Sequence, residues 1–246
     1  MYEMLLLFAG TSTFAVLGLG FVLGLKHATE ADHLAAVTTI VSERKSIWSS
    51  AVIGGLWGLG HTISLFLAGI FVLVLNFEIS EGTERWLEFG VGVMLTILGL
   101  NVLRKVLNGR QLHFHAHEHG HVAHAHPHIH DHSEVEHTAP HKASGKSPRA
   151  LLIGMVHGLA GSAALMLLII PTIDSKIVGL LYIVIFGIGS IGGMILMSFL
   201  VSLPFHLTAS RFNRFNYVLQ VGAGLVSIVL GLWIIYEKGF VEGAFA

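Results

Sequence analysis

Six apolar runs constrain the fold of this chain more than any other feature of its sequence. They cover residues 4–41, 47–77, 86–107, 149–171, 177–203 and 215–236. A helix needs ~20 apolar residues to cross a bilayer, so each run is long enough for one span. Of the 246 residues, 53% are hydrophobic and only 12% are charged, whereas ordinary soluble domains are about 25% charged. The sequence therefore predicts an all-α, polytopic membrane protein.

The first apolar run is too long for one straight span. A helix over residues 4–41 would be ~57 Å long at ~1.5 Å per residue, against ~30 Å of hydrocarbon. We interpret the run as one long, kinked element, which gives six spans in all; two short spans, giving seven, are the alternative. The preceding Met1-Tyr2-Glu3 carries no basic residue, so we expect a retained span and not a cleaved signal peptide.

Ionisable side chains interrupt this first run. Within a few residues of one another lie His27, Glu30, Asp32 and His33. Such side chains are costly inside a bilayer and usually mark a functional site there. Imidazole nitrogen combined with carboxylate oxygen suits a borderline divalent metal such as Ni²⁺, Co²⁺ or Zn²⁺. The alternative, which applies most to Lys26 and Thr29, is a polar helix end that reaches toward the interface.

The spacing of these residues does not fit a regular helix. At ~100° per residue, His27 and His33 lie about 240° apart around a straight helix, and His27 and Asp32 lie about 140° apart. Either the helix is interrupted between about Gly24 and His33, or other segments complete the site from both sides. Interrupted helices near the membrane midplane occur in transporters, because the freed backbone groups can bind ions.

The two halves of the chain resemble each other at an offset near 130 residues. Three pairs of motifs match in the same order: Gly24-Leu25-Lys26-His27 with Gly154-Met155-Val156-His157, Gly58-Leu59-Gly60-His61 with Gly187-Ile188-Gly189-Ser190, and Gly90-Val91-Gly92 with Gly222-Ala223-Gly224. Three spans per half is an odd number, so the second half would be inverted relative to the first. Inverted repeats with a site at their interface are typical of secondary transporters. We predict two inverted three-helix repeats, over 1–107 and 149–246, joined by a loop over 108–148.

Two further histidines, His61 and His157, lie inside predicted spans. A lone intramembrane histidine can serve simply as a hydrogen-bond partner between helices. The repeat makes His157 the counterpart of His27, which favours a shared centre. We therefore predict five metal ligands: His27, Asp32, His33, His61 and His157. Secondary or proton-linked roles are predicted for Glu30, Thr62 and Ser162, and Asp32 is a further candidate for taking up protons when the metal leaves, since ligands must lose protons to bind it.

The loop is dominated by histidine. Residues 113–132 contain ten: His113, His115, His117, His119, His121, His124, His126, His128, His130 and His132. Tracts of this composition are typical of metal binding, and the near absence of apolar residues predicts disorder. A solvated linker without a role is the alternative. Such a tract could buffer, sense or deliver metal.

Basic residues predict the orientation in the membrane. On the six-span plan, ten lie on the side of the loop: Arg44, Lys45, Arg104, Lys105, Arg110, Lys142, Lys146, Arg149, Arg211 and Arg214. The opposite side holds Arg85, Lys176 and Lys238. Basic residues are enriched on the cytoplasmic side, so we expect the His-rich loop to be cytoplasmic and both termini to be outside.

These motifs resemble the nickel/cobalt transporter (NiCoT) family. The likeness is carried by His27-x4-Asp32-His33, by Trp57-Gly58-Leu59-Gly60-His61-Thr62 and by Val156-His157-Gly158-Leu159-Ala160-Gly161-Ser162. Within this family, the chain is similar above all to the urease-accessory branch, a type of nickel permease. The resemblance covers nearly the whole chain outside the loop. The chain departs from the family in two ways: it has room for six or seven spans where larger members resemble an eight-span plan, and Glu30 stands where aspartate is commoner.

The resemblance implies transport of Ni²⁺ or Co²⁺ across the inner or plasma membrane, with the metal as substrate and no resident cofactor. It implies His27, Asp32 and His33 as the core ligands. Nickel uptake is the expectation, and efflux is the alternative because some relatives with His-rich loops are exporters. Expected partners are the metal ion, the lipid bilayer and a cytoplasmic metallochaperone.

Other functional classes fit the sequence less well. We find no Walker motif, and His27-x5-His33 is not the His-Glu-x-x-His pattern of a metallohydrolase, so we expect no enzyme. A membrane metal sensor, in which the loop binds metal and the spans only signal, is a further alternative. A net charge of −1 argues against a nucleic-acid partner, which calls for a basic patch.

Overall fold

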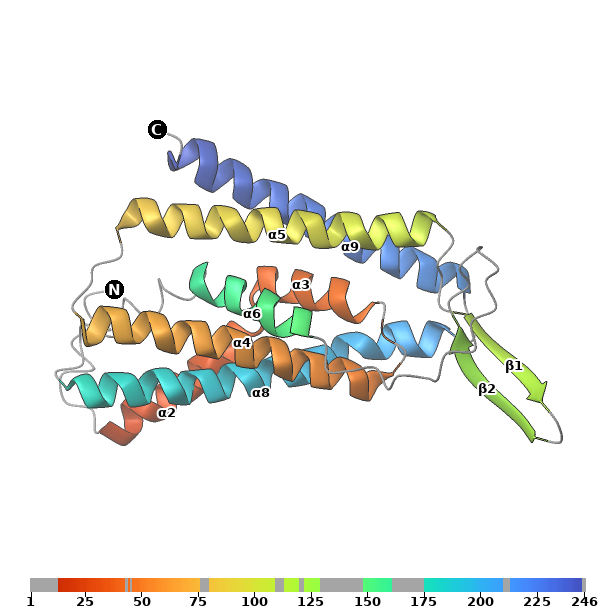
Figure 1. The fold of residues 1–246 in the computed structure, drawn as a ribbon, viewed down its shortest axis with the longest axis horizontal. Coiled ribbons are helices and arrows are strands. Elements are labelled where there is room, and N and C mark those ends of the chain that lie inside the picture. The colour runs from red at the N-terminus through yellow and green to blue at the C-terminus, as the bar shows by residue number, and fades with distance from the viewer. Residues whose placement is uncertain are drawn as a thin grey trace.

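The computed structural model of the chain describes residues 13–42, 44, 46–75, 80–108, 113–119, 122–128, 148–160, 175–209 and 213–244. Seven α-helices lie in this part: α2 (Thr13–His27), α3 (Ala31–Val41), α4 (Ile47–Leu73), α5 (Glu81–Leu107), α6 (Pro148–Ala160), α8 (Lys176–Ala209) and α9 (Asn213–Tyr236). A π-helix, η2 (Glu237–Val241), continues α9. The helices are arranged in layers (Figure 1): α5 and α9 cross on one side, α2, α4 and α8 lie on the other, and α3 and α6 are between them.

The described part of the chain contains fewer candidate membrane spans than the six that the whole sequence predicts. Helices α4, α5, α8 and α9 with η2 are each long and apolar enough to cross a membrane, and the bent pair α2–α3 brings the described part to five at most. The prediction of six counts a span over 149–171, of which α6 (Pro148–Ala160) covers only residues 149–160. The remainder of that run lies outside the described residues. The chain is a multi-pass membrane protein of the α-helical class.

The first apolar run is broken where its ionisable residues lie. Helix α2 ends at His27, α3 begins at Ala31, and the two axes differ by 54°. Across the break, the N–H groups of Thr29 and Glu30 donate to the carbonyls of Lys26 and His27 at 2.9 and 3.1 Å. These bonds span three residues, so they tighten the chain and end the α-helix. The predicted interruption between Gly24 and His33 is confirmed.

Glycines allow the inner helices to pack backbone against backbone. A Cβ atom on Gly24 would collide with the carbonyl of Phe186 in α8, and one on Gly154 would collide with the carbonyl of Trp57 in α4. Small residues of this kind let membrane helices approach closely. The order of these glycine contacts along each pair of helices also shows the relative directions of the helices. Helix α2 is parallel to α8, and α4 is parallel to α6. Helix α4 is antiparallel to α8, and α5 is antiparallel to α9.

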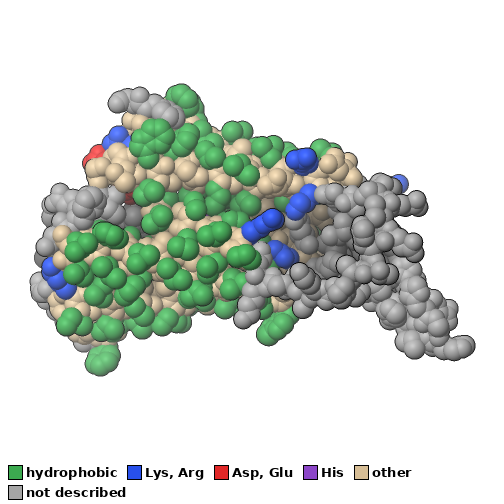
Figure 2. Space-filling view, in the orientation of Figure 1, with side chains coloured by type: hydrophobic (Ala, Val, Ile, Leu, Met, Phe, Trp, Pro, Cys, Tyr) green, Lys and Arg blue, Asp and Glu red, His purple; other side chains and the backbone are tan. Residues whose placement is uncertain are grey.

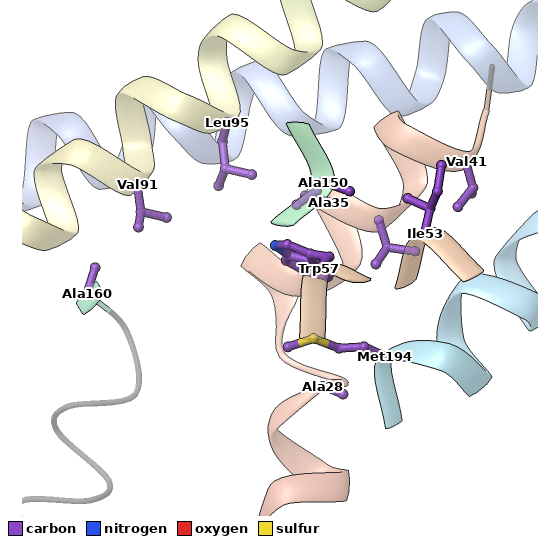
Figure 3. Packing of buried hydrophobic residues seen from close by; sticks show 12 residues of the cluster. Ala28, Ala35, Val41, Ile53, Trp57, Val91, Leu95, Ala150, Ala160 and Met194 are labelled. Atoms are coloured by element: carbon purple, nitrogen blue, oxygen red, sulfur yellow. The ribbon is translucent and has the colours of Figure 1, made fainter. Parts of the chain in front are cut away.

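A buried apolar cluster surrounds Trp57 of α4, which is 1% exposed. Figure 3 shows its ring with Ala35 and Ala150 on one side and Met194 on the other. The cluster thus joins α3, α6 and α8 to α4. The outer faces are apolar as well: hydrophobic side chains cover much of the helical surface (Figure 2), and Trp48, Leu152 and Phe215 are exposed. A contiguous apolar surface of this kind is costly in water and suits lipid.

The predicted loop contains a β-hairpin. Strand β1 (His113–His119) pairs antiparallel with β2 (Val122–His128), and the register places His113 opposite His128 and His115 opposite His126. This differs from the disorder that the composition predicts. Histidine alternates with other residues along β1, and this two-residue period is that of a strand; pairing of the backbones requires no apolar core. The division into 1–107, 108–148 and 149–246 stays a prediction.

Candidate metal centre

Four buried histidines meet where α2, α3, α4 and α6 come together. His27 is the last residue of α2, and His33 lies in the first turn of α3. His61 and His157 come from α4 and α6. None of the four is more than 1% exposed. The break between α2 and α3 turns His27 and His33 toward each other, and their ring centroids are 4.3 Å apart.

The ring nitrogens approach in two pairs. His27 Nε2 lies 3.2 Å from His61 Nε2, and His33 Nδ1 lies 3.3 Å from His157 Nε2. With metal–nitrogen bonds of roughly 2.1 Å, neighbouring ligand atoms are roughly 3.0–3.4 Å apart in octahedral or tetrahedral sites. Without an ion, an N–H on one ring of the His27–His61 pair can donate to the other ring. His33 Nδ1 and His157 Nε2 also face Asp32, so the tautomers decide which of these contacts are hydrogen bonds. The separations therefore suit both a metal-free and a metal-bound centre.

Two carboxylates border the histidines. Asp32 Oδ2 lies 3.0 Å from His157 Nε2, and Asp32 Oδ1 lies 3.0 Å from His33 Nδ1. Asp32 Oδ1 also accepts the backbone N–H of His33 at 2.9 Å, which satisfies a free donor at the start of α3. Glu30 Oε2 lies 2.9 Å from His27 Nδ1. The Asp32 side chain is 21% exposed and that of Glu30 is 37% exposed, so the negative charges lie at the edge of the centre.

Two overlapping sets of ligands result. One consists of His27, His33 and His61, the other of Asp32, His33 and His157; within each set the ligand atoms lie within 4.8 Å of one another. His33 belongs to both. Small movements of the side chains would bring either set to metal-binding distances.

Several ring nitrogens have no hydrogen-bond partner in the described part of the chain. They are His33 Nε2, His61 Nδ1 and His157 Nδ1. His27 Nδ1 also lacks a hydrogen bond of regular geometry, although Glu30 Oε2 lies 2.9 Å from it. An unpartnered polar atom is costly in a buried site, and each such atom is in principle able to bind a metal. The donor chemistry of the centre, imidazole nitrogen with one or two carboxylates, fits Ni²⁺, Co²⁺ or Zn²⁺ better than Mg²⁺ or Ca²⁺, which prefer oxygen.

Aromatic rings close the centre on two sides. The Trp57 ring lies 5.4 Å from the His33 ring and 5.5 Å from the His157 ring, between centroids. Phe186 of α8 lies 5.5 Å from His27. These rings keep water from the imidazoles, which strengthens electrostatic interactions inside the centre.

Known proteins resemble this chain over most of its length. The urease accessory protein UreH of Bacillus sp. (strain TB-90) is 37% identical over 233 residues, which cover 94% of this chain and 95% of that protein. The chain belongs to the UreH family. No family model matches it, and no solved structure matches it.

More distant relatives extend the UreH likeness. The chloroplast protein FOR GROWTH AND FERTILITY 2 of Arabidopsis thaliana is 27% identical over 223 residues. These residues are 90% of this chain but only 56% of that longer protein. The high-affinity nickel transport protein of Cupriavidus necator is 32% identical over 85 residues, 33% of this chain and 24% of that protein. The bacterial relatives bear the names of an accessory protein and a transport protein, and none of the three is named as an enzyme.

The structure brings five of the predicted site residues of this UreH homologue together: His27, Asp32, His33, His61 and His157. Glu30 joins them through His27. Thr62 does not: its hydroxyl donates to the carbonyl of Gly187 in α8 at 3.3 Å, so it ties α4 to α8. Ser162 lies outside the described residues, as do His121, His130 and His132 of the loop. Seven loop histidines lie in strands β1 and β2: His113, His115, His117, His119, His124, His126 and His128.

Sequence reasoning missed the aromatic wall of the UreH-type centre. Trp57 precedes His61 by four residues, and Phe186 precedes Ser190 by four, a spacing that places both members of a pair on one helix face. The matched motifs at 58–61 and 187–190 therefore extend by one aromatic residue each, a signal that was present in the sequence. Ser190 is also fully buried, and its Oγ has no partner among the described residues.

Proposed function

We propose that this chain is a secondary transporter of a divalent transition metal, Ni²⁺ first and Co²⁺ second, and that the buried centre is its transit site. One observation carries the proposal: imidazoles from four separate helix segments converge, fully buried, at metal-ligand separations. A structural histidine needs one partner, whereas these four side chains and Asp32 supply two ligand sets. The family relationship and the shorter likeness to a nickel transport protein support the same conclusion.

The shared ligand suggests how the ion passes. A transit site must bind the ion and also release it, which several weak, adjacent positions achieve better than one tight one. The ion first occupies the set His27, His33 and His61, and then the set Asp32, His33 and His157. His33 is a ligand in both positions, so the ion is never without protein ligands during the step.

Helix directions support the proposed inverted repeats. If α2 corresponds to α6, α4 to α8 and α5 to α9, then the parallel pair α2–α8 has its counterpart in the parallel pair α6–α4. Each helix also runs opposite to its counterpart, as an inversion requires. Phe186 beside His27 and Trp57 beside His157 repeat one contact in both halves. The proposal also includes membership of the NiCoT family, a cytoplasmic His-rich loop and uptake as the direction, as the sequence motifs and the basic residues predict.

A flux measurement tests the proposal. The full chain is reconstituted in oriented vesicles that enclose a Ni²⁺-sensitive dye, with protein-free vesicles and His33→Ala as controls. We expect Ni²⁺ flux with the unchanged chain, none above background with His33→Ala, and no Mg²⁺ flux in either. The orientation in which flux occurs distinguishes uptake from efflux.

The alternatives give different results in the same vesicles. A membrane metal sensor would bind Ni²⁺ without carrying it, so binding with zero flux in folded protein would refute transport. An intramembrane metallohydrolase needs an open metal position and a general base; it would likewise show no flux.

A further inference from the structure

A second feature lies away from the metal centre, between α5 and the helices α3 and α6. It is a cavity of about 870 Å³, within the range of small-molecule sites. Its wall along α5 extends from Gly90 to Lys105, a length of roughly 22 Å at ~1.5 Å per residue. This length is comparable to one leaflet of the hydrocarbon region, which is roughly 15 Å, plus a headgroup.

The α5 wall changes in character along this length. Its first part is apolar, with Val93, Met94, Ile97 and Leu98, and Asn101 and Lys105 follow toward the end of the helix. An occupant that matches this wall has a long apolar portion and a polar head.

The polar part of the cavity is cationic. Arg44 comes from the turn after α3, Lys105 from the last turn of α5 and Arg149 from the first turn of α6. No aspartate or glutamate lines the cavity in the described part of the chain. The start of α6 adds the positive end of its helix dipole. Figure 2 shows Lys and Arg side chains gathered beside the apolar surface, in the half of the molecule from which the hairpin projects (Figure 1).

We propose that this cavity binds an anionic phospholipid. Its phosphate lies among Arg44, Lys105 and Arg149, and one acyl chain follows α5 toward Gly90. Arginine and lysine are the usual partners of phosphate oxygens, and basic pockets between membrane helices bind anionic headgroups. A soluble anion would leave the apolar wall without an occupant, which is why a lipid fits better than free phosphate. The site also lies on the leaflet that the basic residues predict to be cytoplasmic, where anionic lipids are concentrated.

The lipid would join two parts of the fold. The cavity is lined by residues of α5, α3 and α6, and the two short helices α3 and α6 carry His33 and His157. An acyl chain between them completes their packing in the way that a side chain would. The proposal does not depend on the transported ion.

The test compares two matched double variants of the full chain. Lys105→Gln with Arg149→Gln removes cations that line the cavity. Arg104→Gln with Arg214→Gln removes two exposed cations that do not line it, with the same change in net charge. Each protein is exchanged into micelles that contain equal amounts of phosphatidylglycerol and phosphatidylcholine, and bound lipid is counted by native mass spectrometry.

We expect the unchanged chain and the control variant to retain one phosphatidylglycerol. The cavity variant should lose its preference for this lipid by roughly thirtyfold, on the basis of the usual contribution of each basic residue near a headgroup. A third variant, Ile97→Trp, fills the apolar part and should release the lipid with all charges in place. Equal retention by all variants, or loss only in the control pair, would overturn the proposal. Displacement of the bound lipid by soluble glycerol phosphate at equal concentration would show a simple anion site and overturn it as well.

Discussion

Histidine is concentrated in two regions of this chain, which hold it in different physical settings. The centre contains His27, His33, His61 and His157, each fixed by a different helix segment and closed off from water. The segment 113–132 contains ten histidines on a short hairpin and its flanks. An isolated two-stranded hairpin is only marginally stable in water, whereas the four imidazoles are surrounded by packed helices.

The number of histidines in a region therefore does not decide whether that region carries the ion. Ligands that are already in place lose little conformational freedom on binding, and a dry environment strengthens each interaction. Ligands on a frame that is only marginally stable must first be ordered, so they bind more weakly and exchange more readily. We therefore expect the centre to perform transport and the hairpin segment to modulate it.

The largest effect is expected for His33→Ala, because His33 belongs to both ligand sets. Loss of this ligand should lower Ni²⁺ flux in vesicles by roughly a hundredfold or more, at the upper end of what even an outer-shell partner of a metal contributes. His61→Ala removes a ligand from one set only and should retain more flux than His33→Ala. Equal flux in His33→Ala and the unchanged chain, with both proteins monodisperse, would mean that the centre is not the transit site.

Much of this centre could be predicted from the sequence, because membrane burial makes ionisable residues informative. The interruption of the first helix followed from the angular spacing of His27, Asp32 and His33. The proximity of His61 to His27 did not follow from any spacing within one helix, because it depends on how α2 and α4 both pack against α8. The repeat placed His157 opposite His27, which anticipated its element but not its contact with Asp32.

Other parts of the fold were predicted less well, for identifiable reasons. The apolar run 149–171 predicted a full span, which stays a prediction because residues 161–171 lie outside the described part of the chain. The composition of the loop hid the two-residue period that forms β1 and β2. The cavity beside α5 could not be anticipated, since it is lined by residues of three helices that lie far apart in the sequence.

The substitution Glu30→Gln is expected to lower the affinity for Ni²⁺ about tenfold. Glu30 lies beside His27 Nδ1 and orients the ring so that Nε2 is directed at His61. Partners of this kind change metal affinity by about ten- to a hundredfold. The half-exposed position of Glu30 favours the lower figure, because water can replace part of the contact. The measurement is Ni²⁺ affinity by isothermal titration calorimetry, with Glu237→Gln on η2 as a control of equal charge change.

If Glu30→Gln lowered the Ni²⁺ affinity more than His33→Ala does, the assignment of Glu30 as a partner of His27 would be contradicted. It would make Glu30 a direct ligand and move the ion toward the exposed edge of the centre.

Deletion of residues 113–132 should change Ni²⁺ transport less than Glu30→Gln does. Flux should persist, with a change of a few fold in the Ni²⁺ concentration that gives half-maximal rate, because the segment raises the local concentration of metal without a fixed site. Replacement of the ten histidines by serine at constant length is the matched control for chain length. Complete loss of flux in a folded deletion variant would reverse the comparison and make the hairpin segment part of the pathway.

The smallest effect is expected for Lys26→Ala, although Lys26 is adjacent to His27 in the most charged stretch of the first run. Its side chain is exposed, and the residue takes part in the break through its carbonyl, which accepts the N–H and the hydroxyl of Thr29 at 2.9 and 2.6 Å. Alanine retains that carbonyl. Exposed substitutions change free energies by about 0.5 kcal/mol or less, so flux should stay within about twofold of the unchanged chain, while His27→Ala one residue further loses most of it. If both variants lose flux equally, the lysine charge itself acts on the ion, and the distinction between a buried ligand set and its exposed edge fails.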